Sequence, residues 1–274
     1  MNKKLSALLA RPDIWQASAS PQQSGSLSTG YPLLDQNLHL GGWPISTITE
    51  LLCDGSGIGE LEILLPTLAR YASQNRKLVL IAPPYTPYAP ALQSSGIALE
   101  QVLVIQTSST AEQLWAFDQL LRANIAGAVL CWLPDSRVKH QQLRKLQLAA
   151  QLSHGMAVLF RPTRSASEAS PAALRISLSP TPRASHAARF CRLHILKQRG
   201  GWAGQIVDIA RPNKLLVRRV SASDLPVHIP ESSPNHKAAS QNIDMHWDFE
   251  THFPNNPFDL PPDKTPSEID ITLQ

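Results

Sequence analysis

The chain has few of the residues that mark redox, metal or membrane proteins. Its 274 residues include three cysteines without a Cys-x-x-Cys pair, and its nine histidines show no ligand spacing. These patterns predict buried reduced thiols and no metal site. No apolar run approaches the ~20 residues of a membrane span, and Arg11, Pro12 and Asp13 interrupt the first apolar stretch too early for a secretory signal. We therefore expect a soluble, cytoplasmic protein without cofactors.

Acidic residues are scarce in the first part of the chain and gather near its end. The formal net charge is +4, but residues 221–274 hold nine acidic and two basic residues, which leaves 12 acidic and 23 basic residues in 1–220. A basic core with an acidic tail is typical of a protein that meets a polyanionic or acidic partner. It also fits a tail that folds back on its own core.

A glycine-rich turn lacks the residues of a working phosphate-binding loop. Residues 45–66 read ISTITELLCDGSGIGELEILLP, which predicts a strand, a turn and a helix. In such a loop, glycines let backbone N–H groups hold phosphates, and a lysine and a hydroxyl follow the last glycine. Here those two places hold a carboxylate and an alkyl chain, and a carboxylate facing a triphosphate repels it. We therefore expect a degenerate loop that neither holds a nucleotide cofactor nor hydrolyses ATP. Its residues are Asp54, Gly55, Gly57, Gly59, Glu60 and Leu61.

Alternating apolar runs and helical periodicities predict an α/β fold. Strands are expected over 47–52, 77–82, 102–106, 128–133 and 156–160, and helices over 4–17, 31–38, 61–74, 110–126 and 137–153. Strands separated by helices form βαβ units, so we expect a mostly parallel central sheet with helices on both faces. Alternating patterns predict two antiparallel edge strands over 174–178 and 192–197. A last strand is expected over 205–209.

Composition divides the chain into three parts. We expect an N-terminal helix and linker over 1–24, a globular domain over 25–214 and an acidic tail over 215–274. The tail is rich in proline, asparagine and serine and has no apolar period, so we expect it to be disordered.

The entry to the globular domain resembles the RecA core. Residues 28–52, STGYPLLDQNLHLGGWPISTITELL, hold the Thr-Gly, the aspartate-containing helix and the Gly-Gly-x-Pro turn that precede the phosphate-binding strand of RecA. The continuation at 55–69, GSGIGELEILLPTLA, more specifically resembles ImuA, the RecA-like accessory protein of bacterial mutagenic translesion synthesis. The resemblance extends from Leu5 to Ile209 and implies a degenerate RecA-like core.

This resemblance implies a non-catalytic protein. The strand at 128–133 carries Cys131 and Trp132 where a RecA-type ATPase has a metal-binding aspartate. Pro83 and Pro84 stand where the resemblance places the catalytic glutamate. The implied function is a pseudo-ATPase adaptor of SOS-induced mutagenic translesion DNA synthesis. By family, its partners would be an ImuB-type polymerase-like protein, RecA and an error-prone replicative-type polymerase, with any DNA contact weak or indirect.

Two other functions stay open. The central portion, including FRPTRSAS at 160–167, is similar to SulA, the SOS-induced inhibitor of the division protein FtsZ. SulA proteins are short and lack the entry to the phosphate-binding loop and the long tail. The second alternative is a divergent RecA-type ATPase, in which the altered loop would still bind nucleotide.

Candidate partner-binding residues lie mostly near the two ends. Trp15, in the expected N-terminal helix, would dock on RecA or another partner, or pack on its own domain. Aromatic residues among the acids of the tail indicate a segment that folds on a partner, namely Trp247, Phe249, Phe253 and Phe258. Arg161 and Arg164 begin a polar loop at 161–171, where RecA has its second DNA-binding loop, so they are candidates for contact with DNA or a partner.

Overall fold

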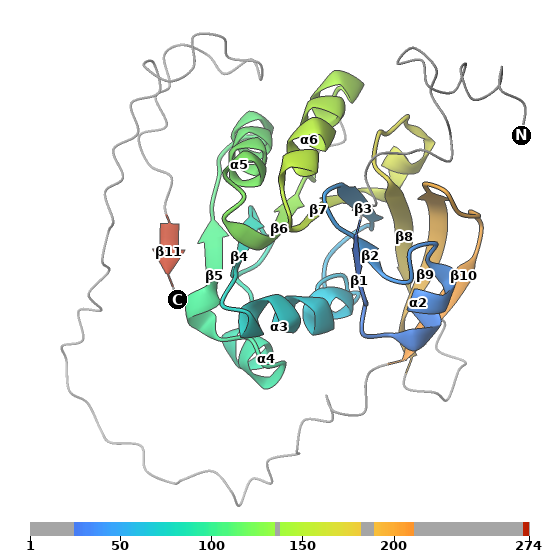
Figure 1. The fold of residues 1–274 in the computed structure, drawn as a ribbon, viewed down its shortest axis with the longest axis horizontal. Helices are drawn as coiled ribbons and strands as arrows, with labels where there is room; N and C mark the ends of the chain where they lie inside the picture. The colour runs from blue at the N-terminus through green and yellow to red at the C-terminus, as the bar shows by residue number, and fades with distance from the viewer. Residues whose placement is uncertain (1–24, 135–137, 182–188, 211–270, 274) are drawn as a thin grey trace, which may run out of the picture.

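The computed structural model describes residues 25–134, 138–181, 189–210 and 271–273. Within them, nine strands form one sheet in the order β10-β9-β8-β3-β7-β6-β4-β5-β11 (Figure 1). They are β3 (Ile48–Leu52), β4 (Lys77–Ile81), β5 (Val102–Ile105), β6 (Ala126–Trp132), β7 (Met156–Arg161), β8 (Leu174–Pro180), β9 (Arg189–Gln198), β10 (Ile206–Ala210) and β11 (Ile271–Leu273). A small separate sheet pairs β1 (Ser26–Leu27) with β2 (Trp43–Pro44).

The middle of the large sheet is parallel and its edges are antiparallel. From β8 to β5, every neighbouring pair of strands runs in the same direction. Strands β9 and β10 extend one side in antiparallel fashion, and β11 pairs antiparallel with β5 on the other side. The predicted mixed α/β fold with a mostly parallel central sheet is confirmed. Strand β11 was not expected, because its sequence lies in the part read as disordered.

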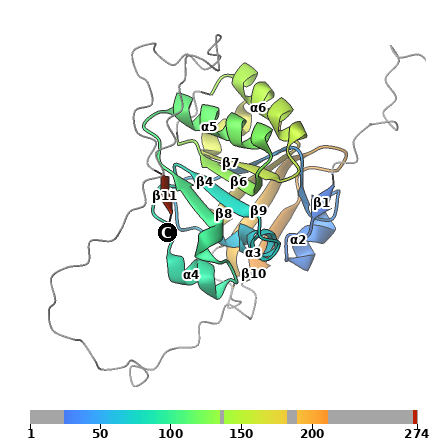
Figure 2. The ribbon, with the colours of Figure 1, turned by 60° about the vertical axis from the view of Figure 1, so that its left-hand side comes forward.

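Helices cover both faces of the parallel strands. The α-helices are α2 (Pro32–Asn37), α3 (Leu65–Ser73), α4 (Ala89–Ser94), α5 (Thr110–Ala123) and α6 (His140–Leu152). Three 3-10 turns are η1 (Glu62–Leu64), η2 (Leu99–Gln101) and η3 (Thr163–Ser167). Helices α5 and α6 lie over one face and α3 and α4 over the other (Figures 1 and 2).

Period-two alternation in the strands builds the two halves of the core. In β4, Leu78 and Leu80 join the cluster under α3, whereas Val79 and Ile81 join the cluster under α5 and α6. Successive side chains of a strand point to opposite faces, so a strand that is apolar throughout needs cover on both sides. The continuous apolar runs seen in the sequence therefore mark the central strands.

Several element boundaries differ from those expected. The helix predicted over 61–74 begins as the 3-10 turn η1 and becomes α-helical only at Leu65. The proline-rich crossover after β4 contains helix α4, with Pro90 in its first turn. Proline suits the first turn of a helix because its φ is already helical and its missing N–H is not needed there. Helix α4 was not among the helices predicted from the sequence.

The parallel strands bring several loops to one edge of the sheet. The loops that follow β3, β4, β5, β6 and β7 all leave from the carboxyl ends of parallel neighbours. In α/β sheets this edge is where ligands usually bind. The glycine-rich loop after β3 lies here, next to the segment that follows β7.

Candidate functional site

The glycine-rich loop occupies the expected place at the carboxyl end of β3. Strand β3 lies between β7 and β8, and the N–H of Cys53 donates to the carbonyl of Arg161 at 2.9 Å. The loop therefore leaves the sheet while still bonded to the end of β7. The strand, loop and helix of a phosphate-binding loop are present, although a 3-10 turn separates the loop from helix α3.

Three glycines shape the loop through positive φ angles. Gly55, Gly57 and Gly59 have φ of 82°, 81° and 98°. A Cβ atom on Gly55 or Gly57 would meet nothing within 4 Å, so backbone conformation and not crowding requires glycine there. Left-handed residues in such a turn aim successive N–H groups into a concavity that suits an anion.

The carboxylate of Glu60 lies in this concavity. The N–H of Gly57 donates to both carboxylate oxygens at 3.0 Å, and the N–H of Ile58 donates to Oε2 at 3.0 Å. Glu60 is only 8 % exposed. The residue that replaces the lysine of a working loop thus turns back and bonds the amides that a phosphate would use.

Asp54 ties the same loop to the segment after β7. Its carboxylate accepts hydrogen bonds from the N–H of Thr163 at 2.9 Å and from the Thr163 hydroxyl. These two bonds and the nearby Arg164 guanidinium hold the pKa of Asp54 below its usual value, against a small opposing effect of burial. The two carboxylates of the loop are therefore both engaged within the protein.

The positions that would bind magnesium in an ATPase are apolar. Leu61 is half-buried and packs against the core. Trp132, at the end of β6, stacks on Phe160 of β7 with ring centroids 4.4 Å apart and planes at 14°. Among the described residues, no group of histidine, cysteine, aspartate and glutamate side chains could hold a metal ion.

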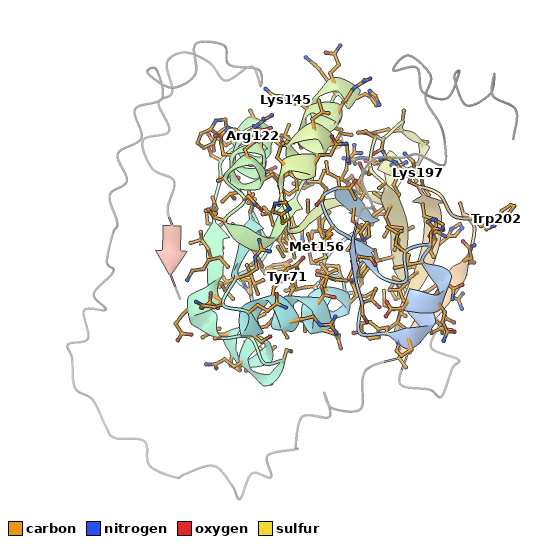
Figure 3. All side chains as sticks on the ribbon, in the orientation of Figure 1. Tyr71, Arg122, Lys145, Met156, Lys197 and Trp202 are labelled. Atoms are coloured by element: carbon orange, nitrogen blue, oxygen red, sulfur yellow. The ribbon has the colours of Figure 1, made fainter. Side chains whose placement is uncertain are left out.

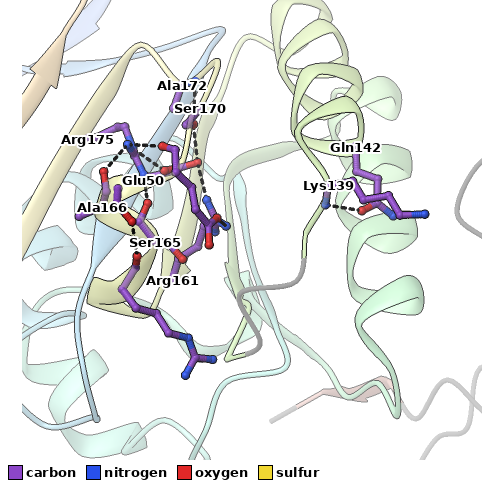
Figure 4. Close-up of polar contacts among 12 residues, drawn as sticks. Glu50, Lys139, Gln142, Arg161, Ser165, Ala166, Ser170, Ala172 and Arg175 are labelled. Atoms are coloured by element: carbon purple, nitrogen blue, oxygen red, sulfur yellow. Dashed lines mark hydrogen bonds and ion pairs between the residues drawn. The ribbon is translucent and has the colours of Figure 1, made fainter.

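A buried ionic cluster lies beside the loop (Figure 4). The carboxylate of Glu50, in the middle of β3, accepts bonds from Arg161 at 3.4 Å and from Arg175 at 2.7 Å. The hydroxyl of Ser170 donates to the same carboxylate at 2.6 Å, and Arg161 also pairs with Glu168 at 2.6 Å. A charge buried in a sheet needs such partners, because removal from water is otherwise very unfavourable.

The second arginine of the cluster holds the chain after β7 in place. The guanidinium of Arg175 donates to the backbone carbonyls of Ser165 at 2.6 Å, Glu168 at 3.0 Å and Ala166 at 3.3 Å. Five residues of this segment form the 3-10 turn η3. The stretch expected as a polar loop is therefore fixed from beneath by a buried side chain.

The structure separates the two arginines that were grouped as a contact loop. Arg161 is the last residue of β7, and its side chain is fully buried in the ionic cluster. Its assignment to a surface loop is wrong, because Glu50 on the neighbouring strand requires a positive partner inside the fold. Arg164 is exposed, and its guanidinium reaches the carbonyl of Pro134 at 3.4 Å.

The three cysteines are free thiols, as predicted. Cys131 and Cys191 are buried and Cys53 is half-buried. Burial, together with the carboxylates of Glu60 and Asp54, raises the pKa of Cys53 to about 12. Burial also raises the pKa of Cys131 above the usual thiol value. Protonated thiols are poor nucleophiles and poor metal ligands, so these residues act as small apolar side chains.

Several expected contact residues lie outside the described part of the chain. They are Trp15, Trp247, Phe249, Phe253 and Phe258. Within the described part, the exposed aromatic residues are Tyr85 and Tyr88, after β4, and Trp202, between β9 and β10. Trp202 is 85 % exposed and points away from the domain (Figure 3).

The buried charges were not predicted from the sequence, although a signal was present. Glu50 is the one charged residue of the strand ITELL, and Arg175 is the one charged residue of the run LRISL. A charged residue in a strand without other charges is rarely buried alone, so an acid and a base in two such strands indicate a pair. Thr163 carried no comparable signal.

Comparison with known proteins points to inhibitors of cell division. The family model "Cell division inhibitor SulA" matches residues 47–157. A protein of that name from Pectobacterium carotovorum is 27 % identical over 150 residues, which cover 54 % of this chain and 84 % of the relative. Its counterpart from Klebsiella aerogenes is 31 % identical over 106 residues, which cover 39 % and 62 %. The crystal structure of SulA from Pseudomonas aeruginosa aligns with 26 % identity and a TM-score of 0.35, over 42 % of this chain and 97 % of that one.

These matches correct the family that the sequence suggested. The ImuA assignment is wrong, because both the family model and the curated relatives are SulA proteins. The adaptor function in translesion synthesis and the partners inferred from it, an ImuB-type protein, RecA and an error-prone polymerase, are wrong for the same reason. The ImuA assignment depended on the glycine-rich loop and the segment before it, whereas the central portion of the sequence already resembled SulA.

The relatives are named as inhibitors of cell division, which is consistent with the prediction of a non-catalytic protein. In the part of the chain that the structure describes, the helices lack the length and apolarity needed to cross a membrane.

Proposed function

We propose that this protein is a SulA-like inhibitor of cell division that binds FtsZ and catalyses no reaction. The observation that carries the proposal is the match of the SulA family model to residues 47–157, which run from β3 into β7. This stretch contains the degenerate loop and four of the central parallel strands in full. We further propose that the protein acts in the cytoplasm as part of the SOS response to DNA damage.

The geometry of the loop supports a binding role. Both loop carboxylates are bonded within the protein, and the position expected to bind metal holds Trp132 stacked on Phe160. An inhibitor needs a stable surface and no turnover, so a loop held by its own carboxylates suits it. Protein partners are usually held by a few exposed aromatic or arginine side chains.

Purified protein and FtsZ provide the direct test. FtsZ assembly, followed by light scattering, and its GTP hydrolysis are measured with increasing amounts of this protein. We expect both to fall as the two proteins approach equal concentration. Expression in a bacterial strain that lacks its own SOS division inhibitors should produce filamentous cells. Normal FtsZ assembly together with normal cell length would overturn the proposal.

The exposed aromatics give a matched pair of variants. Tyr85 and Tyr88 are 76 % and 72 % exposed and lie inside the stretch that matches the family, whereas Trp202 lies outside it. We propose that the two tyrosines contact FtsZ. The double substitution Tyr85→Ala and Tyr88→Ala should weaken inhibition, and Trp202→Ala should leave it unchanged. The reverse pattern would place the contact on the β9–β10 side.

The finer description of the fold is also a proposal. We propose that residues 25–214 are one domain with a RecA-like core, with residues 1–24 before it and residues 215–274 after it, of which β11 pairs with the edge of its sheet. Support comes from the glycine-rich loop after a central parallel strand. Limited proteolysis of the full chain should leave a stable fragment close to 25–214. Cleavage inside the parallel sheet would contradict this.

Contacts between the aromatic residues near the two ends of the chain and a partner protein are proposed from the sequence alone. We propose that Trp15 and the tail residues Trp247, Phe249, Phe253 and Phe258 add to partner binding. Alanine substitution of Trp247 and Phe249 should reduce FtsZ inhibition less than loss of both tyrosines, because the family match does not extend to the tail. Full activity without any of these aromatics would remove them from the site.

A further inference from the structure

The glycine-rich loop is filled by its own carboxylate. Gly57 and Ile58 direct their N–H groups at Glu60, whose two oxygens accept three hydrogen bonds at 3.0 Å. A nest of backbone N–H groups binds anions because each N–H carries a partial positive charge and the groups converge on one point. In this structure the anion is supplied by the chain itself, three residues away.

The surroundings of Glu60 make its carboxylate a close substitute for a bound anion. Glu60 is buried, which limits the access of water to its carboxylate. Hydrogen bonds to an ionised acceptor are roughly twice as strong as neutral ones. A phosphate entering the loop would have to displace this carboxylate and then meet its negative charge at close range.

We propose that Glu60 is an intramolecular ligand of the loop, which holds the loop in its phosphate-binding shape and excludes phosphate and nucleotides from it. The carboxylate thus does in this protein what a bound nucleotide does in an ATPase, since it orders the loop. Burial raises the pKa of Cys53, and the negative charges of Glu60 and Asp54 raise it further, to about 12. This inference does not depend on the identity of the partner protein.

The ordinary alternative is that Glu60 only stabilises the local turn. A carboxylate at the start of α5 gives a matched comparison, because Glu112 accepts bonds from the N–H and hydroxyl of Ser108 without a glycine nest. Removal of either carboxylate should loosen a turn. Only removal of Glu60 should uncover a site with affinity for a free anion.

Titration of the full chain with inorganic pyrophosphate tests the proposal. Wild type, Glu60→Ala and Glu112→Ala are compared at constant ionic strength by calorimetry and by NMR of the Gly57 and Ile58 amides. We expect Glu60→Ala to bind pyrophosphate about tenfold or more tightly than wild type, a change of about 1.4 kcal/mol, with shifts at both amides. Wild type and Glu112→Ala should show neither.

Two results with a folded Glu60→Ala variant would overturn the proposal. One is equal pyrophosphate affinity in wild type and Glu60→Ala. The other is nucleotide binding by wild type that Glu60→Ala abolishes, since that would make the carboxylate part of a working site. If Glu60→Ala does not fold, we expect pyrophosphate or acetate to restore its folding. Absence of such rescue, together with unchanged amide shifts of Glu60→Gln in pyrophosphate, would also reject the proposal.

Discussion

Asp54 and Thr163 join two loops that lie 109 residues apart in the sequence. Both the N–H and the hydroxyl of Thr163 donate to the Asp54 carboxylate, the N–H at 2.9 Å. Since β3 and β7 are adjacent and parallel, the loops that follow them meet at the carboxyl edge of the sheet. Glu60 therefore holds the glycine-rich loop through hydrogen bonds to the loop's own amides, and Asp54 joins the loop to the segment after β7.

Loss of the Asp54 carboxylate should weaken the contact between the glycine-rich loop and Thr163. Asp54 is exposed, so we expect little change in global stability but faster hydrogen exchange of the Thr163 amide in Asp54→Asn. The pKa of Asp54 is lowered in the folded state, so its contribution is fully present above the usual carboxyl pKa and is lost as pH falls through the lowered value. Thr163→Val is the control, because it keeps the N–H bond and loses only the hydroxyl. Unchanged exchange in Asp54→Asn would show that the tie is not significant in solution.

Glu50→Gln should destabilise the fold strongly. The substitution leaves the buried Arg161 and Arg175 without their shared carboxylate, and loss of one partner from a buried ion pair typically costs about 3–5 kcal/mol. Urea denaturation measures the effect. Arg192→Ala is the comparison, because Arg192 is 39 % exposed in its pair with Asp208, and ion pairs open to solvent contribute little to stability. A smaller loss in Glu50→Gln than in Arg192→Ala would contradict the burial argument.

Stability should fall in alkaline solution. Burial raises the pKa of Cys53, Cys191 and Tyr71 to about 12 in the folded protein, from 9.0 for the thiols and 10.0 for the phenol. Each group binds its proton more tightly when folded, so its contribution is full below the unfolded pKa and is lost as pH rises through about 12. Urea midpoints measured at increasing pH should decline from about pH 9 upward. Cys191→Ala should decline less steeply, and an identical slope would exclude this thiol as a cause.

The stacked pair Trp132 and Phe160 should be structural. Trp132→Ala removes a buried ring and should cost about 3–5 kcal/mol in urea denaturation. Trp132→Phe keeps a ring against Phe160 and should retain most of the stability, since aromatic pairs depend on ring contact. Similar losses in both variants would mean that the shape of the indole, and not the stacking, is required.

Local signals in the chain were sufficient for much of the fold. Apolar runs such as that of β4 predicted buried parallel strands, because the period of side chains along a strand depends only on the strand itself. Helix α4 was not predicted, because its segment is rich in proline. Strand β11 could not be predicted either, because its three residues become a strand only by pairing with β5. The loss of the ATPase lysine and hydroxyl was likewise readable from residue identity alone.

The class of function was harder to predict from the same residues. The glycine-rich loop of Gly55, Gly57 and Gly59 favoured an accessory protein of translesion synthesis, yet the similarity of 47–157 is to division inhibitors. A loop of this kind reports a fold and not a partner, since folds of one type serve many functions.

Periodicity and residue type are local properties, so they were enough to predict the class of fold, the parallel centre of the sheet and the absence of catalytic residues from the loop. Which charges meet depends instead on how distant strands pack in three dimensions. Glu50 finds Arg161 and Arg175 over 111 and 125 residues, and Glu60 turns inward to the amides of its own loop. The register of distant strands and the φ angles of the glycines bring these groups within hydrogen-bond distance.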